Sequence, residues 1–478
     1  MANQVEHAER APAVVWLRHE LRLADNPALH AAAQSGRPLV VLYVLDDAAA
    51  GRWRAGGASR WWLHHSLASL GRDIAARGGR LTLRRGLADQ LVPALCEEAG
   101  AAALHFSHAV EPYQAAQDAR VAASLRGRGV EVREHEGAGL FAPGEIRNGQ
   151  GEPFKVFSPF WRACLKAGRP REPLPAPASL EGPELPSEPL QAWALLPTRP
   201  DWAGGLREAW TPGEALAHQR LQAFLAAAVK RYGVERNAPG MEGTSRLSPH
   251  LHFGEISPVQ IWAAAERAEG DTDKFLSEVG WREFSRHLLW QFPELPERNF
   301  RPQFDRFPWG NTPELLEAWR RGRTGYPIVD AGMRQLWASG WMHNRVRMIC
   351  ASFLVKHLLI DWREGEAWFW DTLVDADLAN NSASWQWVAG SGADAAPYFR
   401  VFNPITQAEK FDPEGGYIRR WVPELAKLPA PAIFAPWQAS PLELAAGGVR
   451  LGETYPAPIV DHSEARTRAL AAFERIKG

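Results

Sequence analysis

Cysteine, methionine and tyrosine are scarce in this sequence, with three, five and seven residues among 478. The three cysteines, Cys96, Cys164 and Cys350, lie far apart, and no Cys-x-x-Cys pair occurs. These spacings exclude a disulfide framework and argue against a zinc or iron–sulfur site. We expect three reduced, buried thiols in a cytoplasmic protein.

Long apolar runs and a strong net charge are also missing. No stretch approaches the roughly 18 apolar residues that a membrane-spanning helix requires, and the segment MANQVEHAERAPAVVW lacks the pattern of a secretion signal. The formal net charge of −1 excludes indiscriminate coating of nucleic acid by a strongly basic surface. It is compatible with a local basic groove, because charge can be segregated on one face.

The first part of the chain alternates short apolar runs with helical patterns. Apolar runs occupy residues 14–17, 39–45, 81–83, 102–106 and 130–132, and helical patterns occupy 27–34, 59–77, 87–99 and 114–126. This repetition predicts an α/β fold with a doubly wound parallel sheet, which binds ligands beyond the carboxyl ends of its strands. No GxGxxG or Walker loop follows the first strand, so a standard dinucleotide or P-loop site is excluded.

The composition changes after the fifth apolar run. Nine prolines fall between Pro170 and Pro200 and predict an extended connector. From about Thr211 the pattern becomes helical, and the strings Thr211-Pro212-Gly213-Glu214, Ser248-Pro249 and Ser257-Pro258 have the composition of helix N-caps. We therefore expect an α/β domain at 12–140, a proline-rich connector at 141–210 and an all-helical domain at 211–478.

Tryptophan is in excess, with 22 residues. Its ordinary role is core packing, but its ring also stacks on flat ligands and passes single electrons. The densest polar and aromatic stretch runs from Trp341 to Trp387 and includes Asp375, Asp377 and Asn381. Buried Asp and Asn side chains are costly unless they are paired. The stretch therefore predicts polar groups that converge on a ligand with several ring nitrogens, because a tryptophan-rich core would not explain the acids.

Residues 244–248 precede a predicted helix and carry three hydroxyls and an arginine. Together with the positive end of the helix, they predict an anion site suited to a diphosphate. A plain helix cap is the alternative. Tyr232, twelve residues before this segment, could add a further hydroxyl.

Glu278, Trp281 and Arg282 share one face of another predicted helix, at spacings of three and four. A carboxylate, an indole and a guanidinium on one face suit a flat polar ligand such as a nucleic-acid base. The alternative is an amphipathic helix with a surface ion pair.

Taken together, these motifs resemble the photolyase–cryptochrome family. The resemblance runs from residues 14–18 to 458–462, and the strings at 325–336 and 402–404 are highly specific for it. Within the family, residues 57–67 are most similar to the bacterial class III cyclobutane pyrimidine dimer (CPD) photolyases. The resemblance implies a carbon–carbon lyase in which light-excited, reduced FAD transfers an electron to a dimer flipped out of DNA.

The resemblance also implies which residues bind FAD, whose working form is FADH⁻. Asn381 matches the Asn that faces flavin N5, where an uncharged amide can both donate and accept hydrogen bonds. Glu278 matches the carboxyl group that binds the pyrimidine carbonyl edge, so both residues are implied to be catalytic. The other implied FAD contacts are Tyr232, Thr244, Ser245, Arg246, Leu247, Ser248, Arg347, Asp375 and Asp377.

The resemblance also implies which residues contact the DNA and which tryptophans transfer electrons. Trp281 and Trp387 match the pair that cradles the flipped-out dimer. Trp385, Trp362 and Trp309 match an electron relay on three separate helices, which connects the flavin to the surface and photoreduces oxidised flavin. The further implied lesion or DNA contacts are Arg236, Arg282, Asn344, Arg345, Met348 and Gln407.

An antenna pigment is implied in or beside the N-terminal sheet. Methenyltetrahydrofolate is favoured, with Glu111 near the matching acid, and deazaflavin or FMN are the alternatives. We expect a monomer that acts on CPD-containing DNA and uses neither a metal nor a membrane, since no HExxH or GxSxG motif occurs.

Two other functions within the family compete with CPD repair. A (6-4) photolyase uses two histidines for proton transfer at the lesion, and here Asn344 and Met348 occupy the matching positions. A cryptochrome photoreceptor often adds a long C-terminal tail, whereas this sequence stops at Gly478, soon after the last family motif. Asn381 also favours repair, because plant-type cryptochromes carry Asp at this position and animal-type ones carry Cys.

Overall fold

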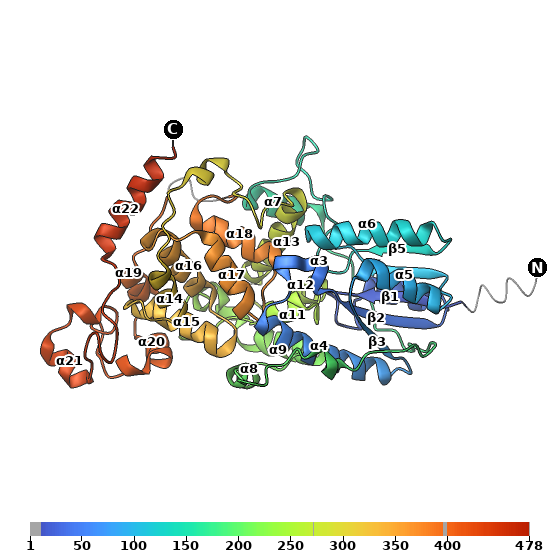
Figure 1. Cartoon of the computed structure of the whole chain (residues 1–478), viewed down its shortest axis with the longest axis horizontal. Coiled ribbons are helices and arrows are strands. Elements are labelled where there is room, and N and C mark those ends of the chain that lie inside the picture. The colour runs from blue at the N-terminus through green and yellow to red at the C-terminus, as the bar shows by residue number, and fades with distance from the viewer. Residues whose placement is uncertain (1–10, 271, 395–398, 478) are drawn as a thin grey trace, which may run out of the picture.

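The computed structural model describes residues 11–270, 272–394 and 399–477, and its N-terminal part is built on a five-stranded sheet (Figure 1). All neighbouring strands run parallel, in the order β3-β2-β1-β4-β5. The strands are β1 (Ala13–Leu17), β2 (Leu39–Leu45), β3 (Leu81–Arg85), β4 (Ala103–Ser107) and β5 (Glu131–His135). This arrangement confirms the predicted doubly wound parallel sheet.

Helices cover both faces of the sheet, which explains why its inner strands are apolar without alternation. In β1, Val15 and Leu17 enter one buried cluster, whereas Val14 and Trp16 enter the cluster on the opposite face. The order of the strands reverses at β1 and β4, so a crevice is expected at the carboxyl ends of these two strands. The flanking helices are α2 (Pro27–Gln34), α3 (Asp47–Ala50), α4 (Gly57–Ala75), α5 (Ala88–Glu98) and α6 (Pro112–Arg126).

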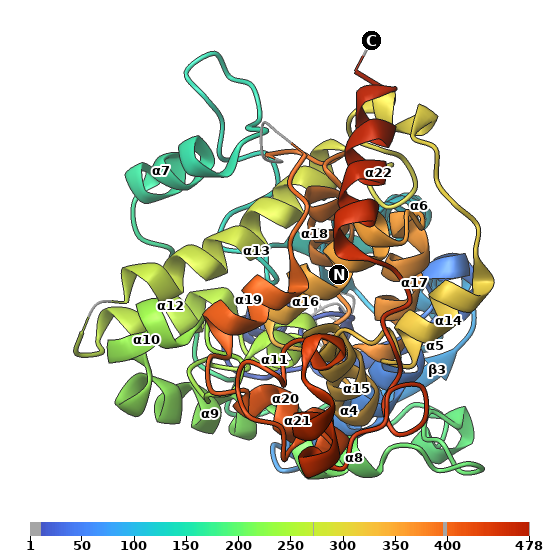
Figure 2. The same ribbon diagram turned by 90° about the vertical axis from the view of Figure 1, so that its left-hand side faces the viewer.

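The segment between the sheet and the helical region is partly extended and partly helical. Its proline-rich part follows the sheet edge, where Leu39 N donates to Glu181 O at 2.9 Å and Glu188 N donates to Leu83 O at 3.0 Å. The same segment also contains α7 (Phe157–Ala167) and α8 (Gly204–Ala209), which the proline content had not led us to expect. Figure 2 shows α7 beside α13, with which it is in contact.

The rest of the chain is helical, and outside the sheet the described residues contain only isolated β-bridges. None of the helices described is long and apolar enough to cross a membrane. The helices are α9 (Glu214–Ala227), α10 (Tyr232–Glu235), α11 (Ser248–His252), α12 (Pro258–Glu266), α13 (Asp273–Gln291), α14 (Pro313–Arg320), α15 (Pro327–Ser339), α16 (Asn344–Ser352), α17 (Trp362–Thr372), α18 (Leu378–Ala389), α19 (Pro404–Phe411), α20 (Gly416–Trp421), α21 (Pro441–Gly447) and α22 (His462–Glu474).

One of the three predicted helix caps is confirmed, and two are wrong, since the N-cap residue of α11 is Leu247 and not Ser248. Ser257 forms a capping box with Gln260 at the start of α12. At α9 the N-cap residue is Gly213, and Thr211 caps nothing. The Glu214 carboxylate instead accepts hydrogen bonds from the backbone N–H groups of Leu23 and Ala24, at 2.7 and 2.9 Å. Glu214 was predicted to cap its own helix, but its side chain connects that helix to the loop that follows β1.

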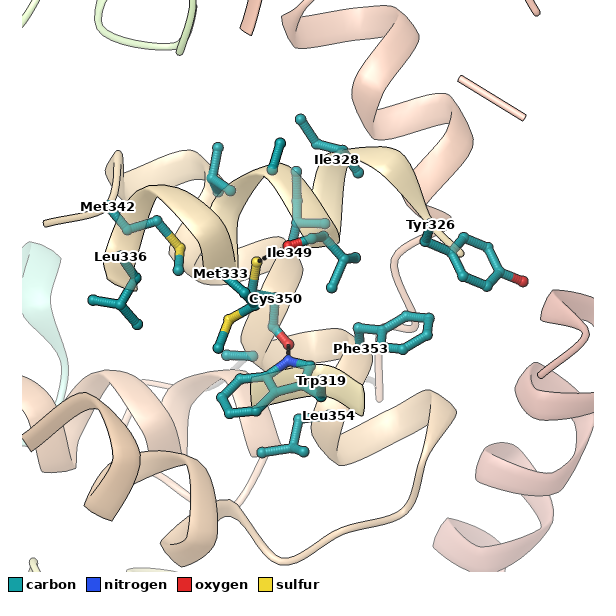
Figure 3. Close-up of a cluster of buried hydrophobic side chains, with 14 of the residues drawn as sticks. Trp319, Tyr326, Ile328, Met333, Leu336, Met342, Ile349, Cys350, Phe353 and Leu354 are labelled. Atoms are coloured by element: carbon teal, nitrogen blue, oxygen red, sulfur yellow. Dashed lines mark hydrogen bonds between the residues drawn. The ribbon is translucent and has the colours of Figure 1, made fainter. Parts of the chain in front are cut away.

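A buried cluster around α15 and α16 supports the helical region (Figure 3). The Trp319 indole donates to Cys350 O at 3.0 Å, and the Cys350 thiol donates to Val329 O at 3.5 Å. A Cβ atom on Gly332 would lie 2.5 Å from Val346 Cγ1, so only glycine allows the two helices to pack this closely. All three cysteines are buried and free, as predicted.

Candidate functional site

Two acids of the Trp341–Trp387 stretch, Asp375 and Asp377, face arginines in the structure. Arg347 on α16 donates through Nη2 to both carboxylate oxygens of Asp375, at 2.8 and 3.1 Å. The Asp375 side chain is 3% exposed, whereas Arg347 keeps 25% of its side chain exposed. Burial of this carboxylate is tolerated because the guanidinium neutralises it. The pair joins α16 to the loop that precedes α18.

Asp377 caps α18 and faces a second arginine. Its carboxylate accepts from Asn380 N at 2.8 Å and lies 3.9 Å from the Arg282 guanidinium. Burial pushes the pKa of Asp377 up, but Arg282 and His252 outweigh it and leave the pKa below its usual value. Arg282 also donates to the backbone carbonyls of Ala138 and Leu251. These contacts place Arg282 beside a predicted cofactor acid, although the sequence had assigned it to the DNA.

Asn381 lies one helical turn further along α18 and is buried. Its amide nitrogen donates to the backbone carbonyl of Glu366 on α17, at 3.0 Å. The two helices are in close contact here, since a Cβ atom on Gly365 would lie 2.1 Å from the Trp385 ring. The position of the Asn381 side chain is therefore set by the backbone of a neighbouring helix.

The segment at 244–248 is not a plain helix cap. The N-cap residue of α11 is Leu247, whose side chain cannot accept a hydrogen bond. Arg246 adopts a positive φ of 51°, and its guanidinium lies near the rings of both Trp210 and Trp341, at 4.3 and 5.1 Å from their centroids. Burial, with help from nearby Arg220, lowers the pKa of Arg246 to about 10.

The polar groups of this segment remain available to a ligand. Arg246 Nε is buried without a partner. The hydroxyl of Ser248 accepts from the Trp341 indole at 3.3 Å. Tyr232 belongs to the same buried cluster as Leu247. A cation and hydroxyls therefore lie on the segment for which the sequence predicts a diphosphate site. Since α11 is only five residues long, the side chains contribute more to this site than the helix dipole does.

A second group of predicted residues lies where α10, α13 and α16 approach one another. Arg236 donates to Glu278 at 2.5 Å, and Lys274 lies 3.4 Å from the same carboxylate. Arg345 donates to Asn237 at 2.5 Å and to Met348 Sδ at 3.7 Å. Several cations thus gather on one face of a protein whose net charge is −1, as a local basic groove would require.

Two more of the predicted DNA contacts border this face. The Arg345 guanidinium lies 4.5 Å from the ring centroid of Phe411 on α19. Gln407 is one turn earlier on that helix, so its side chain projects on the same side. Asn344 is the first residue of α16 and is exposed.

The two tryptophans expected to cradle a base are linked through Asp394. The Trp387 indole donates to Asp394 O at 3.1 Å, and Phe157 N donates to the Asp394 carboxylate at 3.3 Å. The Phe157 ring in turn stacks on Trp281, with centroids 3.8 Å apart and planes inclined by 12°. The sequence interpretation missed Phe157, although Phe157, Phe160, Trp161 and Cys164 recur at helical spacing inside the connector.

The three predicted relay tryptophans differ in burial. Trp385 and Trp362 are 2% and 0% exposed, whereas Trp309 is only partly buried. Trp362 donates to Asn299 at 3.0 Å, and Gly310, next to Trp309, donates to Leu359 O at 2.7 Å. The expectation of three separate helices is wrong for Trp309, which follows the 3₁₀-helix Pro302–Arg306 and lies in a loop.

Glu111 stands at the carboxyl end of β4, where the strand order reverses. It is the N-cap residue of α6 but makes no side-chain cap hydrogen bond. Its Oε2 atom is buried and has no partner. An orphaned carboxylate oxygen at this end of the sheet fits a ligand that brings its own hydrogen-bond donor.

Two family models match parts of this chain, and curated relatives match it over nearly its full length. Residues 13–178 match the family model described as DNA photolyase, and residues 275–475 match that of the FAD binding domain of DNA photolyase. A deoxyribodipyrimidine photo-lyase of Agrobacterium fabrum is 50% identical, with 98% of both chains covered. Cryptochrome-2 of Arabidopsis thaliana is 39% identical over 97% of this chain and 79% of its own.

The similarity extends to a solved structure. A bacterial class III photolyase from Agrobacterium tumefaciens superposes with a TM-score of 0.95 at 50% identity, with 98% of both chains covered. Matches at this identity over nearly the full length show that this chain belongs to the DNA photolyase and cryptochrome family.

Proposed function

We propose that this protein repairs cyclobutane pyrimidine dimers in DNA with light, using FAD as its cofactor. One observation carries the proposal: α13 and α18 pack together. Both helices bear residues that we assign to a ring-binding site and a base-binding site. On α18 these are Asn381 and Trp387, and on α13 they are Arg282, Glu278 and Trp281. The relatives named photo-lyase support repair over photoreception, since the cryptochrome match is weaker.

The side chains present fit FAD. The cation and hydroxyls at 244–248 suit its diphosphate, and Arg246 Nε needs an acceptor. Arg347–Asp375 and Arg282–Asp377 supply paired, directional groups for a ring system. Asn381 adds an amide without adding charge. When bound, reduced FAD supplies the excited electron that opens the dimer, while the protein binds, orients and excludes water.

The lesion site is proposed to work by stacking and hydrogen bonding. Trp281 is held on one face by Phe157, which leaves its ring oriented for a flipped base. Glu278 is positioned by Arg236 and Lys274 and offers a carboxyl group to the pyrimidine carbonyl edge. Arg345, Asn344 and the other cationic or polar residues of this face fix the DNA backbone.

The experiment that tests repair uses the purified, chemically reduced protein. It is mixed with an oligonucleotide that carries one CPD and is illuminated with near-ultraviolet or blue light. We expect dimers to disappear in the light and to persist in the dark. Dimers that survive illumination would contradict the proposal and favour a photoreceptor. Repair of (6-4) products instead would identify the other class of photolyase.

Glu278→Ala should lower the rate of dimer repair about tenfold without releasing FAD. A hydrogen bond to a group that becomes charged contributes roughly 1.5–3 kcal/mol, and each 1.4 kcal/mol is a factor of ten in rate. Repair is measured per photon absorbed, and FAD content by absorbance. Glu269→Ala is the control, since Glu269 also pairs with a lysine but is 92% exposed on its side chain. Loss of FAD in Glu278→Ala would show that Glu278 belongs to the cofactor site.

We propose an antenna pigment at the crevice between β1 and β4, with methenyltetrahydrofolate as the first candidate and deazaflavin or FMN as the alternatives. The unpartnered Glu111 carboxylate supports a ligand there. Chromatography of the pigments released by denaturing protein freshly purified from its native host identifies the antenna. Flavin adenine dinucleotide alone in that extract would contradict a bound antenna. The protein is proposed to work in the cytoplasm as a monomer.

A further inference from the structure

Glu366 is a buried acid at the contact between α17 and α18. Its side chain is completely buried, and Oε1 accepts a hydrogen bond from the Ser382 hydroxyl at 2.5 Å. Oε2 is buried without any partner. The backbone carbonyl of the same residue holds the amide of Asn381. Glu366 therefore contacts both the residue proposed to face flavin N5 and the residue that follows it.

The surroundings of Glu366 favour its uncharged form. A carboxylate with one oxygen lacking a donor costs several kcal/mol when it is buried, whereas a neutral carboxylic acid avoids this cost. No cation forms an ion pair with Glu366 among the residues that the structure describes. The charged groups that act on it from a distance are Arg363 on its own helix, Arg52 near α4 and Glu297 after α13.

These distant charges largely compensate one another. Arg52 lies 2.7 Å from Glu297, and Arg363 is paired with Asp361 at 3.0 Å. Burial is the largest effect and raises the pKa of Glu366 to about 8, although the Ser382 hydroxyl opposes it. The acid is thus neutral at pH 7 and becomes an anion as the pH rises through about 8.

We propose that Glu366 is a positioning residue of the flavin site, which orients Asn381 and keeps the charge beside the flavin at zero by holding a proton. This inference rests on the proposed function, because it needs FAD beside Asn381. An electron added to the ring and a negative charge on Glu366 repel each other, so each disfavours the other. Because this coupling is reciprocal, ionisation of Glu366 makes the bound flavin harder to reduce.

The proposal is tested by infrared spectroscopy and by redox titration of the flavin-loaded protein. The carbonyl stretch of a protonated carboxyl group should be present at pH 7, disappear near pH 8 to 9, and be missing in Glu366→Gln. The ratio of reduced to oxidised flavin is measured at a fixed applied potential at pH 7 and at pH 9. This ratio should fall at least about fivefold more in the wild type than in Glu366→Gln, because fivefold is the lower end of typical coupling between two sites.

Two further variants test the role of Glu366 without replacing the Glu366 side chain. Ser382→Ala retains the acid but removes the hydrogen bond that lowers its pKa, so the carboxyl band should persist to higher pH. Glu364→Gln is the control on the same helix, since Glu364 is exposed and pairs with Arg320 at 3.2 Å, and it should change neither measurement.

The outcomes separate this inference from the proposed function. Flavin-loaded protein without the carboxyl band, or with the same pH dependence in the wild type and Glu366→Gln, would overturn the role of Glu366 alone. Protein that binds no flavin at all would overturn the proposed function and this inference with it.

Discussion

Trp362→Phe will keep FAD bound but stop light from reducing the oxidised cofactor. Trp362 is fully buried, whereas Trp309, another member of the proposed relay, is only partly buried. Phenylalanine fills most of the same space but gives up an electron far less readily than an indole does. It also loses the hydrogen bond to Asn299, which costs about 1 kcal/mol of folding free energy. Photoreduction is measured as the loss of oxidised-flavin absorbance under blue light.

A second buried tryptophan provides the matched control. Trp319 is also 0% exposed, donates one indole hydrogen bond to Cys350 and lies 6.2 Å from Trp385 between ring centroids. Trp319→Phe should therefore cost similar stability and leave photoreduction near the wild-type rate. Chemically reduced Trp362→Phe should repair dimers normally, because the proposed relay supplies electrons only to oxidised flavin and takes no part in dimer opening. Equal loss of photoreduction in both variants would contradict a relay that runs through Trp362.

The sheet could be predicted because its strands are buried on both faces. Val14 to Leu17 form an unbroken apolar run, and the repetition of such runs between helical patterns favours a parallel sheet covered by helices. The last strand, β5, was found by the same pattern through Val130 to Val132, although most of β5 is exposed at the sheet edge. Prediction succeeded where local pattern and tertiary environment agree.

The rest could not be predicted because packing partners are invisible in a single sequence. Glu366 lies between Glu364 and Trp368, in a stretch whose composition suits a solvent-facing helix, and only the approach of α18 buries it. Arg282 was placed on the correct helix face. Residues on that face can reach either of two sites, however. The direction of the Arg282 side chain toward Asp377 depends on the position of α18, which the sequence does not show. The sequence interpretation missed Phe157 because the prolines that follow it led to the whole segment being predicted as an extended connector.

Asp375→Ala will weaken FAD binding about 100-fold. Removal of one partner from a buried ion pair typically costs 3–5 kcal/mol, because the other charge is left unpaired. Arg347 keeps part of its side chain exposed, so the lower end of this range applies, and roughly 3 kcal/mol is a factor of about 100 in the dissociation constant. FAD retention is measured by absorbance after gel filtration and by titration of the apoprotein. Glu424→Ala is the control, since Glu424 pairs with Arg334 at the same 2.8 Å distance.

The double variant Asp375→Ala/Arg347→Ala distinguishes an ion pair that only stabilises the fold from one that contacts FAD. Removing both partners eliminates the unpaired guanidinium, so part of the lost free energy of unfolding should return. If the pair contacts the cofactor, the double variant will be more stable than Asp375→Ala and will still bind FAD poorly. If FAD affinity recovers together with stability, the pair is only a structural link between α16 and the start of α18. The ring site would then depend on Asp377, Arg282 and Asn381 alone.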